Sequence, residues 1–177
     1  GNKKFTGKLT ELGNLHLTLK FLGEISDEKL EEVKKVLSEI KFDKFEATLL
    51  KTGTFSYRKN PRIVWVKLGG PKNPRFFGPK TSRMQDEVSG KGIFDLQTSI
   101  DSVLEKIGFV KENRFMSHLT LARIKYVKDK QGFIDYVDGL NVKKIKFEVS
   151  EFKLKKSELK ISGPVYTTIE NYFLRKE

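Results

Sequence analysis

The chain contains two histidines, and each begins the tetrapeptide His-Leu-Thr-Leu, at residues 16–19 and 118–121. Imidazoles exchange protons near neutral pH, so a pair of them suits a general base and a general acid. A threonine hydroxyl can donate a hydrogen bond to an oxygen on which negative charge develops. We therefore predict that His16, Thr18, His118 and Thr120 form one catalytic site for a phosphodiester.

The composition narrows the chemistry of such a site. The 177 residues include no cysteine, which excludes a thiol nucleophile, a disulfide scaffold and cysteine-ligated zinc or iron–sulfur clusters. Two histidines fall short of the three or four protein ligands that zinc takes, and no glycine-rich phosphate loop is present. The prediction is a reaction without a metal or other cofactor. The alternative is that both histidines are structural strand residues.

The elements around the two motifs must position their side chains. Residues 15–21 alternate apolar and polar, which predicts a strand with His16 and Thr18 on one face. A second strand over residues 115–124 would present His118 and Thr120 in the same way. If the two strands are neighbours or face each other across a groove, the four side chains converge.

The rest of the chain alternates between strand and helix patterns. Ser26 or Asp27 can cap a helix whose apolar residues recur every three or four positions up to Ile40, and Gly108 is suited to end a later one. Further strands are predicted over residues 45–55, 62–68, 142–154 and 165–174, and further helices over 100–107 and 129–140. This order predicts an α+β domain with antiparallel sheet.

The charge favours a polyanionic partner. Lysine and arginine number 35 against 23 acidic residues, a net charge of +12. Nucleic acid is the usual partner of such a surface, although lysine-rich faces also serve solubility. No apolar run approaches the ~20 residues of a membrane span, and no signal peptide is recognisable, so we expect a cytoplasmic protein without membrane contact.

Three stretches resemble the 2H phosphoesterase superfamily, named for paired His-x-Thr/Ser-x motifs. They are NLHLTLKFLG at residues 14–23, SHLTLAR at 117–123 and GPVY at 163–166, and PRIVW at 61–65 is similar to the family's central strand. Within the superfamily the chain is most similar to the RNA 2′,3′-cyclic phosphodiesterases, also called 2′-5′ RNA ligases.

The resemblance implies a fold and an activity. Residues 1–177 would form one bilobal α+β domain, in which two antiparallel sheets with flanking helices surround a central groove with pseudo-twofold symmetry. The substrate would be RNA with a 2′,3′-cyclic phosphate end, for example a tRNA fragment, hydrolysed by a monomer to a 2′-phosphomonoester. By family analogy His16 protonates the leaving 3′ oxygen and His118 takes the proton from water. The reverse reaction would join RNA ends through a 2′-5′ linkage.

Two regions depart from the family pattern. Members begin with a short apolar strand and a helix before the first motif, but residues 1–11 are too polar for that strand, so we expect both elements to be missing. Residues 69–92 form a longer loop than the family needs. Its cations either contact the RNA backbone or belong to a plain surface loop; they are Lys72, Arg75, Lys80 and Arg83.

Three further residues are candidates for substrate binding. Arg123 suits a bidentate phosphate contact, but strict alternation places it on the face of Leu119 and Leu121, away from His118, unless a bulge or a strand end turns it. Tyr166 and Phe55 either stack on unpaired bases or belong to the core.

Two other functions share the same motifs. The groove could hold a nucleotide or RNA end without turnover, as a binding module, which the missing N-terminal strand favours. An exonuclease acting on RNA 3′ ends would also carry both motifs.

Overall fold

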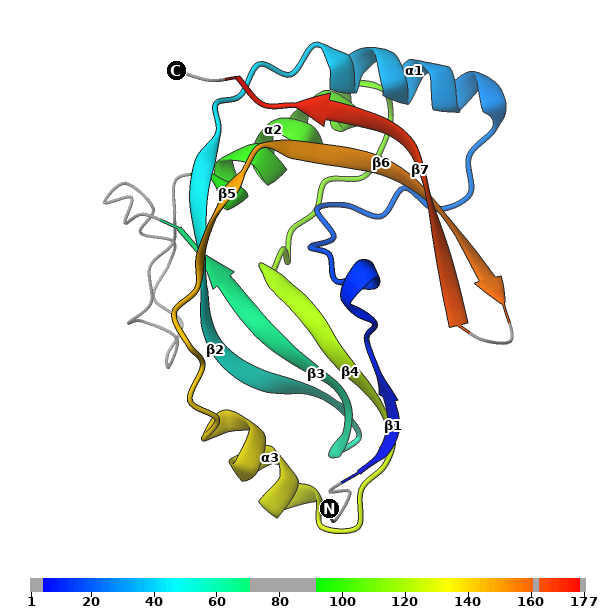
Figure 1. The fold of residues 1–177 in the computed structure, drawn as a ribbon. Helices are drawn as coiled ribbons and strands as arrows, with labels where there is room; N and C mark the ends of the chain where they lie inside the picture. The colour runs from blue at the N-terminus through cyan, green and yellow to red at the C-terminus, as the bar shows by residue number, and fades with distance from the viewer. Residues whose placement is uncertain (1–4, 71–91, 161–162, 176–177) are drawn as a thin grey trace. The chain divides into compact units, whose positions relative to one another are not determined.

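A computed structural model describes residues 5–70, 92–160 and 163–175 (Figure 1). Residues 71–91, with the four loop cations named above, lie outside the described part. The elements, in chain order, are β1 (Thr6–Leu9), the 3-10 turn η1 (Leu12–Asn14), α1 (Asp27–Ser38), β2 (Phe45–Tyr57), β3 (Asn60–Gly69), α2 (Ile93–Lys106), β4 (His118–Tyr126), α3 (Lys130–Asp138), β5 (Lys146–Val149), β6 (Glu151–Lys160) and β7 (Gly163–Phe173).

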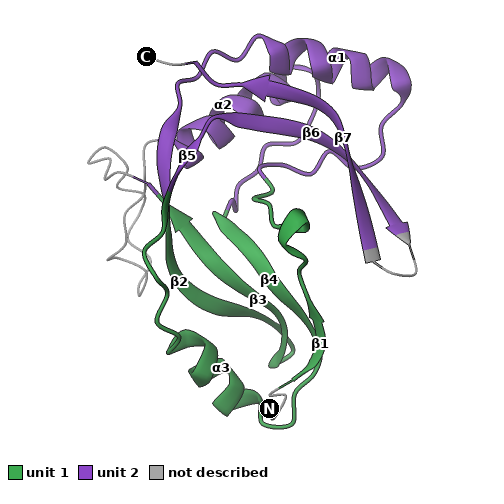
Figure 2. Ribbon diagram, viewed as in Figure 1, with its two compact units in different colours: residues 1–18, 48–69, 116–146 green, residues 19–47, 70–115, 147–177 purple. Residues whose placement is uncertain are grey.

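The chain divides into two compact units, each assembled from segments far apart in the sequence (Figure 2). Unit 1 contains residues 1–18, 48–69 and 116–146, and unit 2 contains residues 19–47, 70–115 and 147–177. Both complete His-Leu-Thr segments fall in unit 1. The catalytic residues predicted from the sequence therefore all belong to one unit.

Unit 1 is built on an antiparallel sheet. The strand order is β1-β4-β3-β2, continued by β5 beyond β2. Helix α3 packs on one face of this sheet, where Phe133 and Val137 form a core with Val64, Ala122 and Ile124. The hydroxyl of Thr52 donates a 2.5 Å hydrogen bond to the Val137 carbonyl, which ties β2 to the end of α3.

The connection between β2 and β3 is tighter than the gap between the strands predicted over residues 45–55 and 62–68. Arg58 and Lys59 alone form the turn, with φ of 47° and 62°. A two-residue hairpin turn with both central residues at positive φ matches the twist of the flanking strands. Arg58 and Lys59 are both exposed. Because the turn has only two residues, it pairs Tyr57 with Asn60 and so sets the register of β2 against β3.

Unit 2 buries its own core between helices and a two-stranded antiparallel sheet. Val33 and Leu37 of α1 and Leu96, Ile100 and Leu104 of α2 pack with Phe152, Leu154, Tyr172 and Leu174 of the β6–β7 segment. Ser26 caps α1 by accepting a 3.3 Å hydrogen bond from the Lys29 N–H. No helix in the described residues has the length and apolar character needed to cross a bilayer.

Most predicted elements are confirmed, and three predictions are wrong. No strand occurs at residues 15–21, which run as irregular backbone from η1 towards α1. Alternation predicts an extended segment, but a strand also needs a neighbour to complete its hydrogen bonds. The predicted strand over residues 142–154 is instead β5 and β6, divided near Ser150. The expectation that no strand precedes the first motif is also wrong, because β1 pairs with β4 although its four residues are all exposed and show no alternation.

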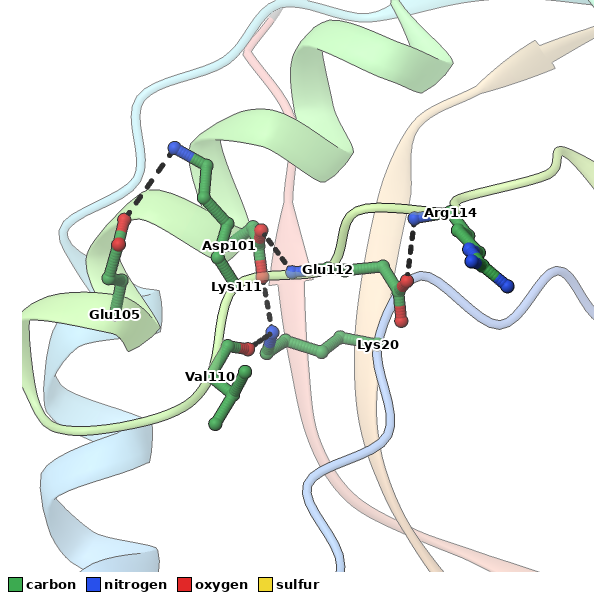
Figure 3. A network of polar contacts seen from close by, with 7 residues as sticks. All are labelled: Lys20, Asp101, Glu105, Val110, Lys111, Glu112 and Arg114. Carbon is green, nitrogen blue, oxygen red and sulfur yellow. Dashed lines mark hydrogen bonds and ion pairs between the residues drawn. The ribbon is translucent and has the colours of Figure 1, made fainter.

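A buried ion pair anchors unit 2 (Figure 3). Lys20 and Asp101 pair with side chains only 6% and 5% exposed. The Lys20 ammonium also donates a 2.6 Å hydrogen bond to the Val110 carbonyl, and Asp101 accepts one of 2.8 Å from the Glu112 N–H. Lys20 follows the first motif directly, and residues 110–112 lead towards the second. The ion pair therefore ties the segment that follows the first motif to the segment that precedes the second, inside unit 2.

We expect Asp101→Asn to lower the free energy of unfolding by roughly 3–5 kcal/mol, because the lysine would stay buried without a countercharge. Burial alone would raise the pKa of Asp101, but the hydrogen bonds from Lys20 and Glu112 hold it below its usual value. The stabilisation is thus complete above the usual carboxyl pKa of about 4 and is lost as pH falls through the lowered value.

Urea unfolding at pH 7 and at lower pH measures both effects. In the double variant Lys20→Met/Asp101→Leu the stability should partly return, because no charge is then left buried alone. Equal stability of Asp101→Asn and the wild type at pH 7 would contradict the assigned role of the pair.

Candidate functional site

The two imidazoles are held by the same local hydrogen bond. His16 Nδ1 lies 2.8 Å from the Asn14 carbonyl oxygen, and His118 Nδ1 lies 2.8 Å from the Met116 carbonyl oxygen. In each case the carbonyl belongs to the residue two positions earlier. Both side chains are half-buried. The repeated motif thus carries a repeated contact between the ring and the backbone, although His118 begins strand β4 and His16 lies in irregular backbone.

This hydrogen bond determines which nitrogen can do chemistry. A carbonyl oxygen only accepts hydrogen bonds, so Nδ1 must carry the proton in both rings. In the neutral imidazole Nε2 is then the basic nitrogen, and in the imidazolium it is the acidic one. Since the Nδ1 bond persists in both charge states, either histidine can exchange a proton at Nε2 without turning its ring.

Strand β4 places His118 and Thr120 on one face of the unit 1 sheet. In the β3–β4 ladder His118 is opposite Lys67, and Thr120 is opposite Trp65. Directly opposite residues of antiparallel strands project to the same face. The helix α3 core lies on the other face, since Val64 of β3 belongs to it. We call the face with His118, Thr120, Trp65 and Lys67 the histidine face.

A bulge in β4 brings Arg123 to the histidine face. Trp65 is opposite Thr120 and the next residue of β3, Val64, is opposite Ala122, so Leu121 is an extra residue in β4. Beyond the bulge Arg123 is opposite Ile63, which alternates with Trp65 onto the histidine face. The placement expected from strict alternation is therefore wrong. Arg123 is exposed.

An aromatic group supports the His118 ring. Phe55 of β2 meets it edge to face, with ring centroids 5.0 Å apart, and the ring of Trp65 lies 5.5 Å from that of Phe55. Position 53 must be glycine for this packing, because a Cβ there would collide with the Trp65 ring. Phe55 thus contacts a candidate catalytic residue. Its predicted stacking on a base stays a prediction.

The other predicted residues lie elsewhere. Thr18 follows His16 in the irregular segment and is half-buried. Tyr166 belongs to unit 2, where it is opposite Ser157 in the β6–β7 ladder. Sequence reasoning missed Lys67 and Lys8, which is opposite Arg123 in the β1–β4 ladder. Lys67 follows Trp65 by two positions in a predicted strand, and alternation could have predicted that the two side chains share a face.

The described residues contain no group of three or more histidine, cysteine, aspartate or glutamate side chains arranged to hold a metal ion. The donors on the histidine face are instead imidazole nitrogens, a hydroxyl and cationic side chains. Such a set suits proton transfer and binding of an anion.

Comparison with known proteins identifies the family. The family model described as "LigT like Phosphoesterase" matches residues 1–65 and 86–166. The chain belongs to the LigT-like phosphoesterase family. The predicted family resemblance and the α+β fold with antiparallel sheets are confirmed.

Relatives within the LigT-like family match along most of the chain. The chain is 32% identical over 170 residues to a Methanothermobacter thermautotrophicus protein named RNA 2′,3′-cyclic phosphodiesterase, covering 94% of this chain and 82% of that one. An Aeropyrum pernix protein of the same name is 32% identical over 164 residues, covering 92% and 83%.

Solved structures agree with these relatives. A Thermus thermophilus protein superposes with a TM-score of 0.69 at 27% identity, covering 96% of this chain and 83% of that one. E. coli LigT, crystallised with 3′-AMP, superposes with a TM-score of 0.63 at 25% identity, covering 95% and 81%.

We expect both histidines to be in the tautomer with the proton on Nδ1 when neutral. Long-range ¹H–¹⁵N correlation spectra of ¹⁵N-labelled protein show the tautomer directly, and this chain has only two imidazoles to assign. A His16→Ala variant removes one signal and so assigns the other. Either ring with the proton on Nε2 would contradict the carbonyl contacts.

Proposed function

We propose that this protein hydrolyses terminal RNA 2′,3′-cyclic phosphates to 2′-phosphomonoesters by paired histidine acid–base catalysis. The single observation that carries the proposal is the shared Nδ1–carbonyl hydrogen bond, which leaves Nε2 of both His16 and His118 as the proton-exchanging atom. Family membership and the names of the relatives support the substrate class.

The proton transfers follow from the two charge states. Neutral His118 accepts a proton from water at Nε2 while the water oxygen forms a bond to phosphorus. The bond between phosphorus and the 3′ oxygen breaks, and protonated His16 donates its Nε2 proton to that oxygen. The products are a 2′-phosphomonoester and a free 3′-hydroxyl. Exchange with solvent then restores both imidazoles. The assignment of His118 as base and His16 as acid rests on family analogy.

Other residues of unit 1 would stabilise the phosphoryl group. The hydroxyls of Thr18 and Thr120 would donate hydrogen bonds to the non-bridging oxygens, which gain charge in the transition state. Arg123 reaches the histidine face through the bulge at Leu121, and its guanidinium suits two parallel contacts to phosphate oxygens. Phe55 would stack on a terminal base. The reverse of this reaction is the 2′-5′ ligation of RNA ends.

An oligonucleotide ending in a 2′,3′-cyclic phosphate, incubated with the protein in excess chelator, tests the proposal. We expect a product with a 2′-phosphate, identified by its chromatographic mobility against 2′- and 3′-phosphate standards. Replacing His16 or His118 with alanine should lower kcat/KM by at least ~10²-fold, the scale of general acid–base catalysis. The kcat/KM profile should be bell-shaped in pH, since one ring must be neutral and the other protonated.

Matched substrates separate the proposal from its alternatives. A 3′-hydroxyl RNA of the same sequence should stay intact, whereas an exonuclease would shorten it. Binding of the cyclic phosphate end without turnover would identify a binding module instead. Loss of turnover in chelator, or a pH profile without two limbs, would contradict the histidine mechanism.

A further inference from the structure

We propose that Lys67 is a substrate-binding residue that contacts a non-bridging phosphoryl oxygen beside His118, and that it holds the 2′-phosphomonoester product more tightly than the cyclic substrate. This inference rests on the proposed function. It concerns a residue of β3, outside both His-Leu-Thr segments.

The register places Lys67 next to His118. The three pairs Trp65–Thr120, Val66–Leu119 and Lys67–His118 follow one another without a shift. The Cβ atoms of directly opposite residues in antiparallel strands lie about 4.5–5.5 Å apart, with both side chains on the same face. A lysine side chain extends about 5 Å beyond its Cβ, so the ammonium can reach an anion held at the His118 imidazole.

The charge of Lys67 is available for such an anion. Its side chain is half-buried, and within the described part of the chain its ammonium forms no ion pair or hydrogen bond. Lys8, opposite Arg123 in the β1–β4 ladder, instead pairs with Glu11 at 3.3 Å. A bound phosphate would supply the countercharge that the described residues do not give to Lys67.

The charge of the ligand gives the inference its specific consequence. The cyclic phosphodiester carries one negative charge, whereas a phosphomonoester carries about −1.5 to −2 at neutral pH. A fixed cation attracts the more highly charged ligand more strongly. Lys67 should therefore contribute more to the affinity for the product than to the affinity for the substrate, and it should slow product release.

Titration calorimetry with a nucleoside 2′-monophosphate, together with KM for the matching nucleoside 2′,3′-cyclic phosphate, tests this. We expect Lys67→Met to weaken binding of the monoester by roughly ten- to a hundredfold, the effect of losing a hydrogen bond to a charged group. KM for the cyclic phosphate should rise by a smaller factor, and Lys67→Arg should stay within a few-fold of the wild type for both ligands.

The matched control is Lys130→Met. Lys130 is exposed at the start of α3, the helix that packs on the other face of the sheet, and its loss changes the net charge equally. It should leave both ligands unaffected. An unchanged monoester affinity in Lys67→Met, or equal losses for the monoester, the cyclic phosphate and the uncharged nucleoside, would overturn the inference. Wild-type protein that binds the monoester but does not hydrolyse the cyclic phosphate would overturn only the proposed function.

Discussion

The functional account depends on two hydrogen bonds, from His16 Nδ1 to the Asn14 carbonyl and from His118 Nδ1 to the Met116 carbonyl. Each fixes the tautomer of its ring through the backbone of the residue two positions earlier. The same ring can therefore act as a base in one motif and as an acid in the other.

The sheet of unit 1 supplies the groups around His118. A bulge and a glycine shape the histidine face. The bulge at Leu121 brings Arg123 to it, and the glycine at position 53 makes room for Trp65, which packs with Phe55 behind the imidazole. The regular part of the ladder adds Lys67. The cations of this face thus come from strands β1, β3 and β4, outside the repeated tetrapeptides.

The helices, the paired motifs and the family could be predicted from the sequence, because each depends on a local pattern. It could not predict the placement of Arg123, since a bulge appears only when two strands are aligned. The alternation at residues 15–21 was misleading, because an extended pattern does not show whether a partner strand is available. Polar β1 was missed for the converse reason: the outer edge of β4 pairs with it despite its exposed residues.

A crystal structure with a nucleoside vanadate, which mimics the five-coordinate phosphorus of the transition state, tests the central claim most directly. The account predicts that Nε2 of His16 and Nε2 of His118 each lie within about 3.2 Å of an apical oxygen, on opposite sides of the vanadium. A complex in which either Nε2 is turned away from the vanadate, or both contact the same oxygen, would contradict paired acid–base catalysis.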